Sequence, residues 1–260
     1  MPRETGSTPA PARALSFDLA AAQYEAARPG YPPALFDAIE ELTGRPLHGA
    51  DAVDIGAGTG KATRALLARG ARVTAVEPGP GMAAQLRRAL PGTPLVRGTG
   101  DALPLTDHCA DLLTYAQSWH WTDPLRSVPE ALRVLRPGGA LALWWNVADG
   151  SVPWIADQER RLSAGLADSV HGAPGHARRL PAELRPLERT LHWTRRVPLS
   201  THLDNLGSHS LFLTRSPRAA AEFLDRERAE LLRVFPDGFV LEEYAVELTV
   251  ALRAALPPLA

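Results

Sequence analysis

The chain has little that would tie it to the cell exterior, to a membrane or to a nucleic acid. Its 260 residues contain a single cysteine, Cys109, so no disulfide can form within the chain, and we expect a reduced thiol and a cytoplasmic location. No stretch approaches the roughly eighteen apolar residues of a membrane span, and residues 1–13 lack the apolar core of a signal peptide. A net charge of −1 provides no basic excess for phosphate backbones. These absences predict a monomer or homodimer that acts on a small molecule, with no nucleic-acid or membrane partner.

Residues 14–146 are expected to form one α/β core. From Ala50 to Trp145, strand patterns alternate with helical patterns, which favours right-handed βαβ crossovers and a parallel sheet. The sequence therefore predicts a doubly wound, Rossmann-like sheet. After the first strand we expect strands at 72–77, 110–115 and 140–145, and helices at 15–27, 33–42, 61–69, 82–90 and 129–135.

The two ends of the chain differ from this core. Residues 1–13 are rich in Pro, Thr, Ser and Ala and are expected to form a disordered tail. Residues 147–260 are expected to form a cap or lid insertion and the C-terminal strands that complete the same domain. Glycines and prolines interrupt residues 168–186, and we expect a lid over the substrate mouth there. Helical patterns stand at 152–166 and 217–235, and strand patterns at 189–199 and 241–252.

A glycine-rich loop follows the first strand. The segment Val53-Asp54-Ile55-Gly56-Ala57-Gly58-Thr59-Gly60-Lys61 leads from an apolar run into a helix. Glycines suit such a turn because it needs a positive φ or a close backbone approach. The first N–H groups of the helix would face an anionic group of the ligand. Lys61 stands where a dinucleotide fingerprint requires a small residue, which disfavours NAD and FAD.

An acidic residue closes the second strand. Glu77 ends the β-branched run that begins at Arg72, at the carboxyl edge where open α/β sheets bind ligands. Its distance from the glycine loop fits the acidic residue about twenty positions on that recognises ribose hydroxyls. Met82, in the following helix, either lays its thioether against an adenine ring or packs in the core.

Four segments in this order resemble the motifs of the class I S-adenosylmethionine-dependent methyltransferases. They are the G-x-G-x-G loop preceded by Asp54, the strand-end Glu77, Gly100-Asp101-Ala102-Leu103-Pro104-Leu105, and Leu135-Arg136-Pro137-Gly138-Gly139 before a strand. The resemblance implies a seven-stranded sheet with an antiparallel last strand, S-adenosylmethionine as cofactor and S-adenosylhomocysteine as product. It also implies that Asp101 accepts from the adenine amino group and that the Ala102 N–H donates to the ring.

The N-terminal element Tyr24-Glu25-Ala26-Ala27-Arg28-Pro29-Gly30-Tyr31-Pro32 resembles that of small-molecule methyltransferases akin to trans-aconitate methyltransferase. That resemblance implies that Tyr24, Arg28 and Tyr31 lie over the cofactor or substrate, with surface packing as the alternative. The expected cofactor site consists of Tyr24, Arg28, Asp54, Gly56, Ala57, Gly58, Gly60, Glu77, Pro78, Met82, Asp101, Ala102 and Gln117.

The catalytic chemistry depends on the acceptor. Methyl transfer is an in-line displacement, so alignment suffices for an ionised acceptor, whereas a hydroxyl, amine or carbon acid needs a base. His120, in Trp119-His120-Trp121, is the candidate catalytic base. Packing between its two tryptophan neighbours is the alternative, and both interpretations stay open. Arg28 is a candidate clamp for a substrate carboxylate; Arg215 and Arg218 are weaker candidates, better read as exposed at a helix start.

Other functions were compared with a small-molecule methyltransferase. A metal held by His120 with His171, His176, His202 or His209 would permit C-methylation of an α-keto acid, but the spacings match no compact signature and we assign no metal ligand. A non-catalytic cofactor-binding protein and an NAD-dependent oxidoreductase are the alternatives from other classes.

Overall fold

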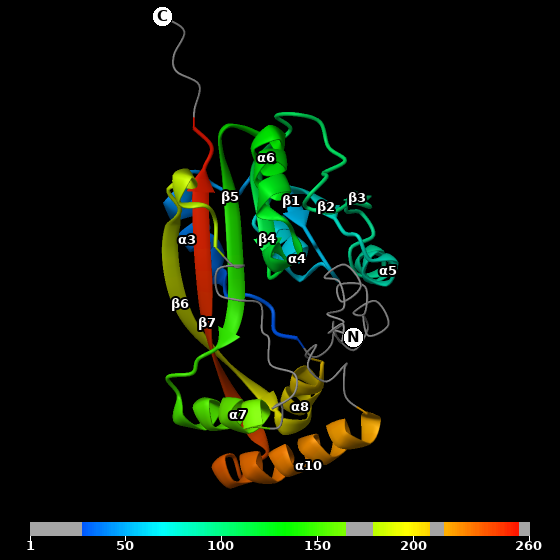
Figure 1. The fold of residues 1–260 in the computed structure, drawn as a ribbon, viewed down its shortest axis with the longest axis vertical. Helices are drawn as coiled ribbons and strands as arrows, with labels where there is room; N and C mark the ends of the chain where they lie inside the picture. Colours follow the sequence, from blue (N-terminus) through cyan, green and yellow to red (C-terminus); the bar gives the residue numbers. More distant parts are fainter. Residues whose placement is uncertain (1–27, 165–178, 209–215, 255–260) are drawn as a thin grey trace, which may run out of the picture.

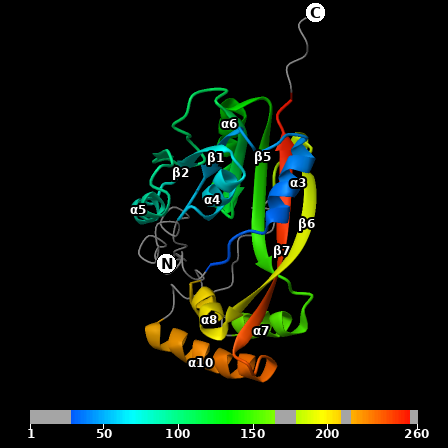
Figure 2. The same cartoon turned by 180° about the vertical axis from the view of Figure 1, so that it is seen from behind.

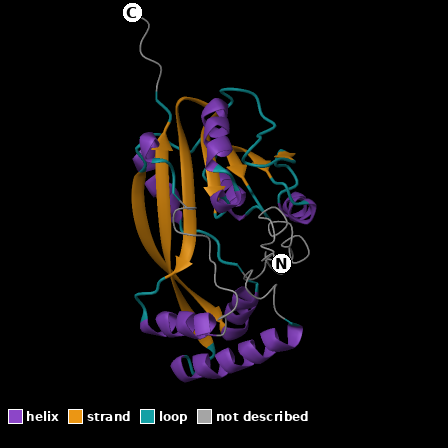
Figure 3. Ribbon diagram, in the orientation of Figure 1, coloured by secondary structure: helices purple, strands orange, loops and turns teal. Residues whose placement is uncertain are grey.

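The computed structural model describes residues 28–164, 179–208 and 216–254. They contain one seven-stranded sheet in the order β3-β2-β1-β4-β5-β7-β6 (Figure 1, Figure 3). The strands are β1 (Asp51–Ile55), β2 (Arg72–Val76), β3 (Leu95–Val96), β4 (Ala110–Ala116), β5 (Leu135–Ala148), β6 (Leu187–Pro198) and β7 (Phe239–Leu252).

The sheet is parallel from β3 to β5 and antiparallel beyond it. Strand β1 pairs in parallel with β2 and with β4, and β4 pairs in parallel with β5. Strand β7 pairs antiparallel with β5, with Trp145 opposite Glu247, and β6 pairs antiparallel with β7. The predicted Rossmann-like sheet with an antiparallel last strand is therefore confirmed.

Helices cover both faces of the sheet. Helices α3 (Pro33–Thr43) and α4 (Lys61–Ala68) bury apolar side chains such as Phe36 and Leu66 against one face, which Figure 2 shows from behind. Helix α6 (Pro124–Val134) packs Ala131 and Val134 on the opposite face (Figure 1). Helix α5 (Pro80–Ala89) buries Leu86 beside β2. The doubly wound architecture follows, because each parallel crossover places a helix on one face.

A helical cap extends beyond the carboxyl ends of β4 and β5. It comprises α7 (Pro153–Ala164), α8 (Leu199–Gly207) and α10 (Pro217–Val234), together with the lower ends of β6 and β7 in Figure 1. Short 3₁₀ turns lie at Trp119–Trp121 and Ala182–Leu184. In the part of the chain that the structure describes, no helix has the length and apolar character needed to cross a bilayer.

Two elements begin well before the predicted residue, and two elements were not predicted. Helix α6 begins at Pro124 and not at residue 129, because the Asp123 side chain accepts from the Leu125 N–H and caps the helix, which tolerates Pro129 inside it. Strand β5 begins at Leu135, since Leu135 pairs with Ala110 ahead of a register shift. The two-residue β3 and α8 were not predicted. The expected tail, the helix at 15–27 and most of the lid lie outside the described residues.

The cap is held together by a buried polar network. Glu242 on β7 is 2% exposed, and its carboxylate accepts from Arg195, from His202 at 2.7 Å and from the Tyr244 hydroxyl at 2.9 Å. Glu227 on α10 is 1% exposed and accepts two hydrogen bonds from Arg161 at 2.8 and 2.6 Å. Burial removes the hydration of a carboxylate, and the arginines beside both of these carboxylates offset that loss.

Gln158 joins the two halves of this network and determines which ring nitrogen of His202 donates to Glu242. Its Nε2 lies 3.0 Å from Glu227 Oε1 and 3.0 Å from His202 Nε2. A carboxylate only accepts, so the Gln158 amino group faces Glu227 and its second N–H donates to His202 Nε2. The remaining nitrogen, Nδ1, then carries the proton and donates to Glu242. Three helices and two strands are thereby connected through His202.

Replacing Glu242 is expected to destabilise the protein. Burial by itself would raise the pKa of Glu242, but hydrogen bonds from His202 and Arg195 outweigh it and hold the pKa below its usual 4.5. Glu242→Gln leaves buried donors without their charged partner, so we expect a loss of about 3 kcal/mol in the free energy of unfolding at pH 7, measured in urea. Because the folded-state pKa is lowered, this difference should be full above pH 4.5 and shrink as the pH falls through the lowered pKa.

Asp237→Asn is the matched control, since Asp237, in the turn before β7, pairs with Arg196 on β6 in an exposed ion pair. This control should cost far less than Glu242→Gln. An equal loss in both variants would show that burial of the network has no special weight.

Candidate functional site

The glycine loop between β1 and α4 adopts the backbone conformation that its sequence predicted. Gly56, Gly58 and Gly60 have φ values of 68°, 59° and 94°, all in the left-handed region that favours glycine. A Cβ added to Gly56 would lie 2.5 Å from Ser118 Cβ. At Gly58 the nearest heavy atom, the Gly56 carbonyl oxygen, would be 4.0 Å away. A Cβ at Gly56 would therefore clash with Ser118, whereas the position of a Cβ at Gly58 is open.

Ser118 fixes the loop from the neighbouring strand. It follows β4, is 8% exposed, and its hydroxyl donates to the Ile55 carbonyl at 2.6 Å. The sequence analysis did not single it out, although its position just after a strand in a segment expected to face the cofactor was a usable signal. Thr59, inside the loop, is 2% exposed, and its Oγ1 has no hydrogen-bond partner among the described residues.

Asp54 lies beneath the loop. It is fully buried, and its carboxylate accepts from Thr63 Oγ1 at 2.6 Å and from Thr114 Oγ1 at 3.0 Å. Burial raises the pKa of Asp54, and the two threonine hydrogen bonds oppose that rise. The side chain therefore links the end of β1 to the first turn of α4 and to β4.

Glu77 lies where the sequence predicted, directly after β2. Its side chain is 6% exposed and accepts from the Gly58 N–H at 2.8 Å and from the Gly79 N–H at 2.7 Å. Arg97 donates to the Glu77 carbonyl at 3.1 Å and to that of Pro78. Met82, in the first turn of α5, is 6% exposed. A buried carboxylate is thus held against the glycine loop by main-chain donors.

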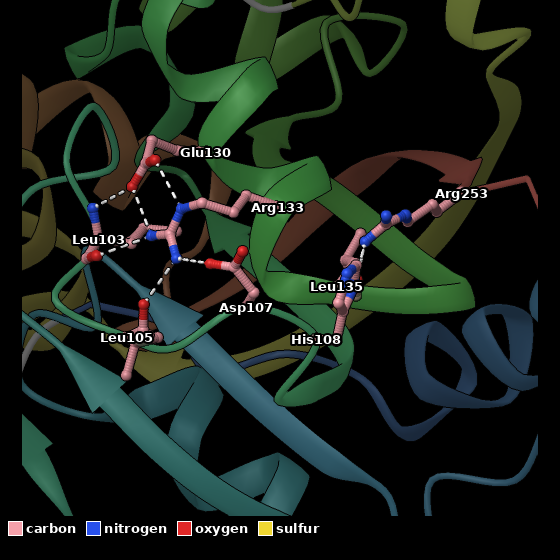
Figure 4. Close-up of polar contacts among 8 residues, drawn as sticks. All are labelled: Leu103, Leu105, Asp107, His108, Glu130, Arg133, Leu135 and Arg253. Atoms are coloured by element: carbon pink, nitrogen blue, oxygen red, sulfur yellow. Dashed lines mark hydrogen bonds and ion pairs between the residues drawn. The ribbon is translucent and has the colours of Figure 1, made fainter.

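The segment Gly100–Leu105 is pinned in place by α6 (Figure 4). Glu130 accepts from the Leu103 N–H at 2.7 Å, and Arg133 donates to the carbonyls of Leu103 at 3.0 Å and Leu105 at 2.8 Å. Hydrogen bonding to Arg133 lowers the pKa of Glu130, so the pair stays charged. Neither residue was assigned a role from the sequence, because the contacts join segments nearly thirty residues apart.

Asp101 and Ala102 lie at the start of that segment. The Asp101 carboxylate accepts from the Asp123 N–H at 2.9 Å, which attaches the segment to the N-terminus of α6. Ala102 is exposed, and its N–H makes a long contact of 3.3 Å with the Thr99 carbonyl.

Gln117 and His120 follow β4 on the same edge. Gln117 has a φ of 56°, which is uncommon for a residue with a side chain and is found preferentially at functional sites. Its Nε2 donates to the Tyr31 hydroxyl at 3.3 Å, and Tyr31 packs edge-on against Trp144 at 5.6 Å. His120 is half-buried in a 3₁₀ turn, with its ring centroid 4.5 Å from that of Trp121.

Arg28 connects the N-terminal segment to the cap. Its Nε donates to Ser208 Oγ at 2.9 Å and its Nη2 to the Ser208 carbonyl at 3.3 Å, at the C-terminus of α8. Arg218 is exposed at the start of α10 and pairs with Glu222 at 2.8 Å. The remaining predicted residues, Tyr24, His171, His176, His209 and Arg215, lie outside the described residues.

These side chains gather at one edge of the sheet. Gly56, Glu77 and Gln117 follow three neighbouring strands, β1, β2 and β4, at their carboxyl ends. Ala57 and Gly60 complete the loop between β1 and α4. In the described ranges, no three His, Cys, Asp or Glu side chains are grouped closely enough to hold a metal ion. The carboxyl edge of these strands therefore carries main-chain N–H donors, the buried carboxylate of Glu77 and the ring of His120.

Known proteins share this organisation. A family model described as a methyltransferase domain matches residues 53–143, from β1 to β5. An uncharacterized methyltransferase of Mycobacterium tuberculosis is 37% identical over 249 residues, which cover 93% of this chain and 96% of that protein. The chain belongs to the class I S-adenosylmethionine-dependent methyltransferases. The dinucleotide-dependent oxidoreductase that the sequence analysis kept as an alternative is thereby set aside.

Two further similarities bear on the methyltransferase. A solved structure from Anaeromyxobacter dehalogenans, named "putative type II methyltransferase", has a TM-score of 0.65 and 25% identity, covering 88% of this chain and 99% of that one. A malonyl-[acyl-carrier protein] O-methyltransferase of Pectobacterium atrosepticum is 34% identical over 119 residues, 45% of this chain and 47% of that protein. The similarity to the malonyl-[acyl-carrier protein] enzyme thus covers less than half of either protein.

Gly56→Ala and Gly58→Ala are expected to differ in stability. Both place a Cβ on a left-handed residue, which costs about 1–2 kcal/mol. Gly56→Ala also forces the new methyl group against Ser118, and overpacking of this kind adds about 1–3 kcal/mol. Urea unfolding should therefore show the larger loss for Gly56→Ala. Equal losses would mean that the contact with Ser118 does not constrain the loop.

Proposed function

We propose that this methyltransferase transfers a methyl group from S-adenosylmethionine to a small acceptor molecule, with the cofactor at the carboxyl edge of β1, β2 and β4. The observation that carries the proposal is the pairing of the left-handed glycine loop with the buried carboxylate of Glu77 through the Gly58 N–H. When bound, the cofactor supplies an electrophilic methyl group on its sulfonium.

The loop has the properties that an amino-acid moiety requires. Space in front of Gly58 admits a ligand close to the main chain, and the N-terminus of α4 favours an anion such as a carboxylate. Thr59 Oγ1, buried without a partner among the described residues, is a donor for that group. Asp54 would contribute indirectly, because its hydrogen bond to Thr63 holds the first turn of α4 in place.

Glu77 is proposed to accept the ribose hydroxyls. Each of its oxygens accepts one main-chain N–H, and an ionised carboxylate offers about four acceptor sites in all. The main-chain donors keep the carboxylate oriented before the cofactor arrives. Pro78 and Met82 would border the adenosine on one side, and Asp101 and Ala102 on the other.

Gln117, Arg28 and Tyr31 would enclose the reacting end of the cofactor. Gln117 and Tyr31 are joined by a hydrogen bond, and Arg28 stands three residues before Tyr31 and touches the cap. Alignment of acceptor and methyl group, with exclusion of water, is the main task of such a site. His120 is proposed as the base for an acceptor that must lose a proton; a role in packing against Trp121 is the alternative.

A carboxylate-bearing acceptor agrees best with Arg28 at the cap and with the partial similarity to the malonyl-[acyl-carrier protein] enzyme. Free malonate and malonyl carrier protein, each offered with labelled S-adenosylmethionine, separate a small acceptor from a carrier-bound one. Metal-assisted C-methylation has less support: His202 is the only one of the four predicted cap histidines that is described, and both its ring nitrogens are hydrogen-bonded. A cytoplasmic location remains a prediction.

Glu77→Gln should weaken binding of S-adenosylhomocysteine by about ten- to a hundredfold in calorimetric titration. The reason is the loss of a charged acceptor, because hydrogen bonds to charged groups contribute about 1.5–3 kcal/mol. Glu188→Gln, a change of an exposed glutamate on β6, should leave the affinity unaltered. Unchanged affinity in Glu77→Gln, with the wild-type enzyme binding, would remove Glu77 from the ribose site.

His120→Ala should lower kcat at least a hundredfold while leaving the affinity for S-adenosylhomocysteine near that of the wild type, since general bases contribute about 10²- to 10⁴-fold. The assay uses labelled donor with an acceptor that must lose a proton, found in a panel of small alcohols and amines. His192→Ala is the control, because it changes an exposed histidine on β6. Normal turnover in His120→Ala would favour the packing role.

A further inference from the structure

Asn205 presents an unusual feature in the cap. It lies on the buried side of α8, one turn after His202, and is 6% exposed. Its Nδ2 donates to the Tyr244 hydroxyl at 3.2 Å, but its Oδ1 is buried and has no hydrogen-bond partner among the described residues. An unsatisfied buried carbonyl is costly, and such groups commonly await a water or a ligand.

The orientation of this amide is fixed by the network behind it. Burial raises the pKa of Tyr244, so its hydroxyl stays protonated. That proton points to Glu242, which only accepts, and the Tyr244 oxygen is left to receive a hydrogen bond. Asn205 must therefore turn its amino group toward Tyr244 and its carbonyl oxygen away from the network. Arg195 and His202 contribute indirectly, because both donate to Glu242 and thereby hold the acceptor of the Tyr244 proton in place.

Asn205 is connected through its main chain to the segment that leads to the proposed methyl site. The Ser208 hydroxyl donates to the Asn205 main-chain carbonyl at 2.7 Å and accepts from Arg28 at 2.9 Å. Three residues after Arg28, Tyr31 accepts from Gln117 at the end of β4. Figures 1 and 2 both show the segment after residue 28 running from α8 toward α3, past the carboxyl ends of the strands. A short series of contacts thus connects Asn205 with Gln117.

We propose that Asn205 is a specificity-determining residue that accepts a hydrogen bond from an O–H or amide N–H of the methyl acceptor. The proposal rests on the proposed function, because it places the acceptor between the cap and the end of β4. The Asn205 carbonyl would repel a carboxylate directly opposite it, and the guanidinium of Arg28 nearby disfavours an ammonium group. The predicted acceptor is therefore a hydroxylated or amidated molecule with no cation at this position.

Matched pairs of acids with and without one hydroxyl test this prediction. The probes are malate against succinate, citrate against tricarballylate and 3-hydroxybutyrate against butyrate. Each is titrated by calorimetry into enzyme saturated with S-adenosylhomocysteine and is then assayed with labelled donor. In at least one pair we expect the hydroxy acid to bind about tenfold more tightly, as one satisfied hydrogen bond allows.

Variants assign the discrimination to one residue. Asn205→Leu should reduce the tenfold preference to less than about twofold, with S-adenosylhomocysteine affinity unchanged. Asn205→Gln keeps the amide and should retain part of the preference if the leucine variant folds poorly. The control is Asn146→Leu, because Asn146 on β5 accepts from Trp193, the ring that stacks on Tyr244 at 5.2 Å, and its loss leaves α8 intact.

Three outcomes would overturn the proposal. They are the absence of any preference within every pair, a preference that persists in Asn205→Leu, and a loss in Asn146→Leu as large as in Asn205→Leu. Failure of the proposed function is recognised separately, because the wild-type enzyme would then not bind S-adenosylhomocysteine in the first titration.

Discussion

The close approach of Gly56 to Ser118 is the constraint on which the site depends. A glycine is required because any side chain would meet Ser118, and the Ser118 hydroxyl returns a hydrogen bond to Ile55 at the end of β1. This contact brings the loop after β4 against the loop after β1. Gln117 and His120, which flank Ser118, are therefore held beside the glycine loop. Without that approach, Gln117 and His120 would separate from the glycine loop.

Buried carboxylates are used in two different ways in this methyltransferase. Asp54 and Glu242 are enclosed by side-chain donors and connect elements that must not move relative to one another. Glu77 is also buried, yet main-chain N–H groups of Gly58 and Gly79 hold it. The difference is chemical: side-chain donors join a carboxylate to separate elements, whereas main-chain donors orient it against the loop that supplies them. Burial alone would not separate these roles.

The sequence predicted the parts of the molecule whose structure is encoded locally. The glycine loop and Glu77 were found because turn geometry and strand ends have residue signatures of their own, and the parallel, doubly wound sheet followed from the alternation of elements. The start of α6 was missed because Pro129 was taken for an N-terminus, while the Asp123 cap lay six residues earlier. Ser118, Arg133 and Asn205 were missed because their partners are distant in sequence, and no spacing rule reports such contacts.

The cap explains why acceptor identity is hard to infer from the chain. Its interior is a network of charged and amide groups with apolar clusters at the margins, and each polar group takes its meaning from its partners in space. Asn205 illustrates the point: an asparagine in a helix has no evident role until Tyr244 is seen to take its amino group. Since Tyr244 is in turn oriented by Glu242, the direction of the Asn205 carbonyl depends on a carboxylate that the methyl acceptor need not touch. Selection for a new acceptor could therefore act on the network as well as on the residues in contact with it.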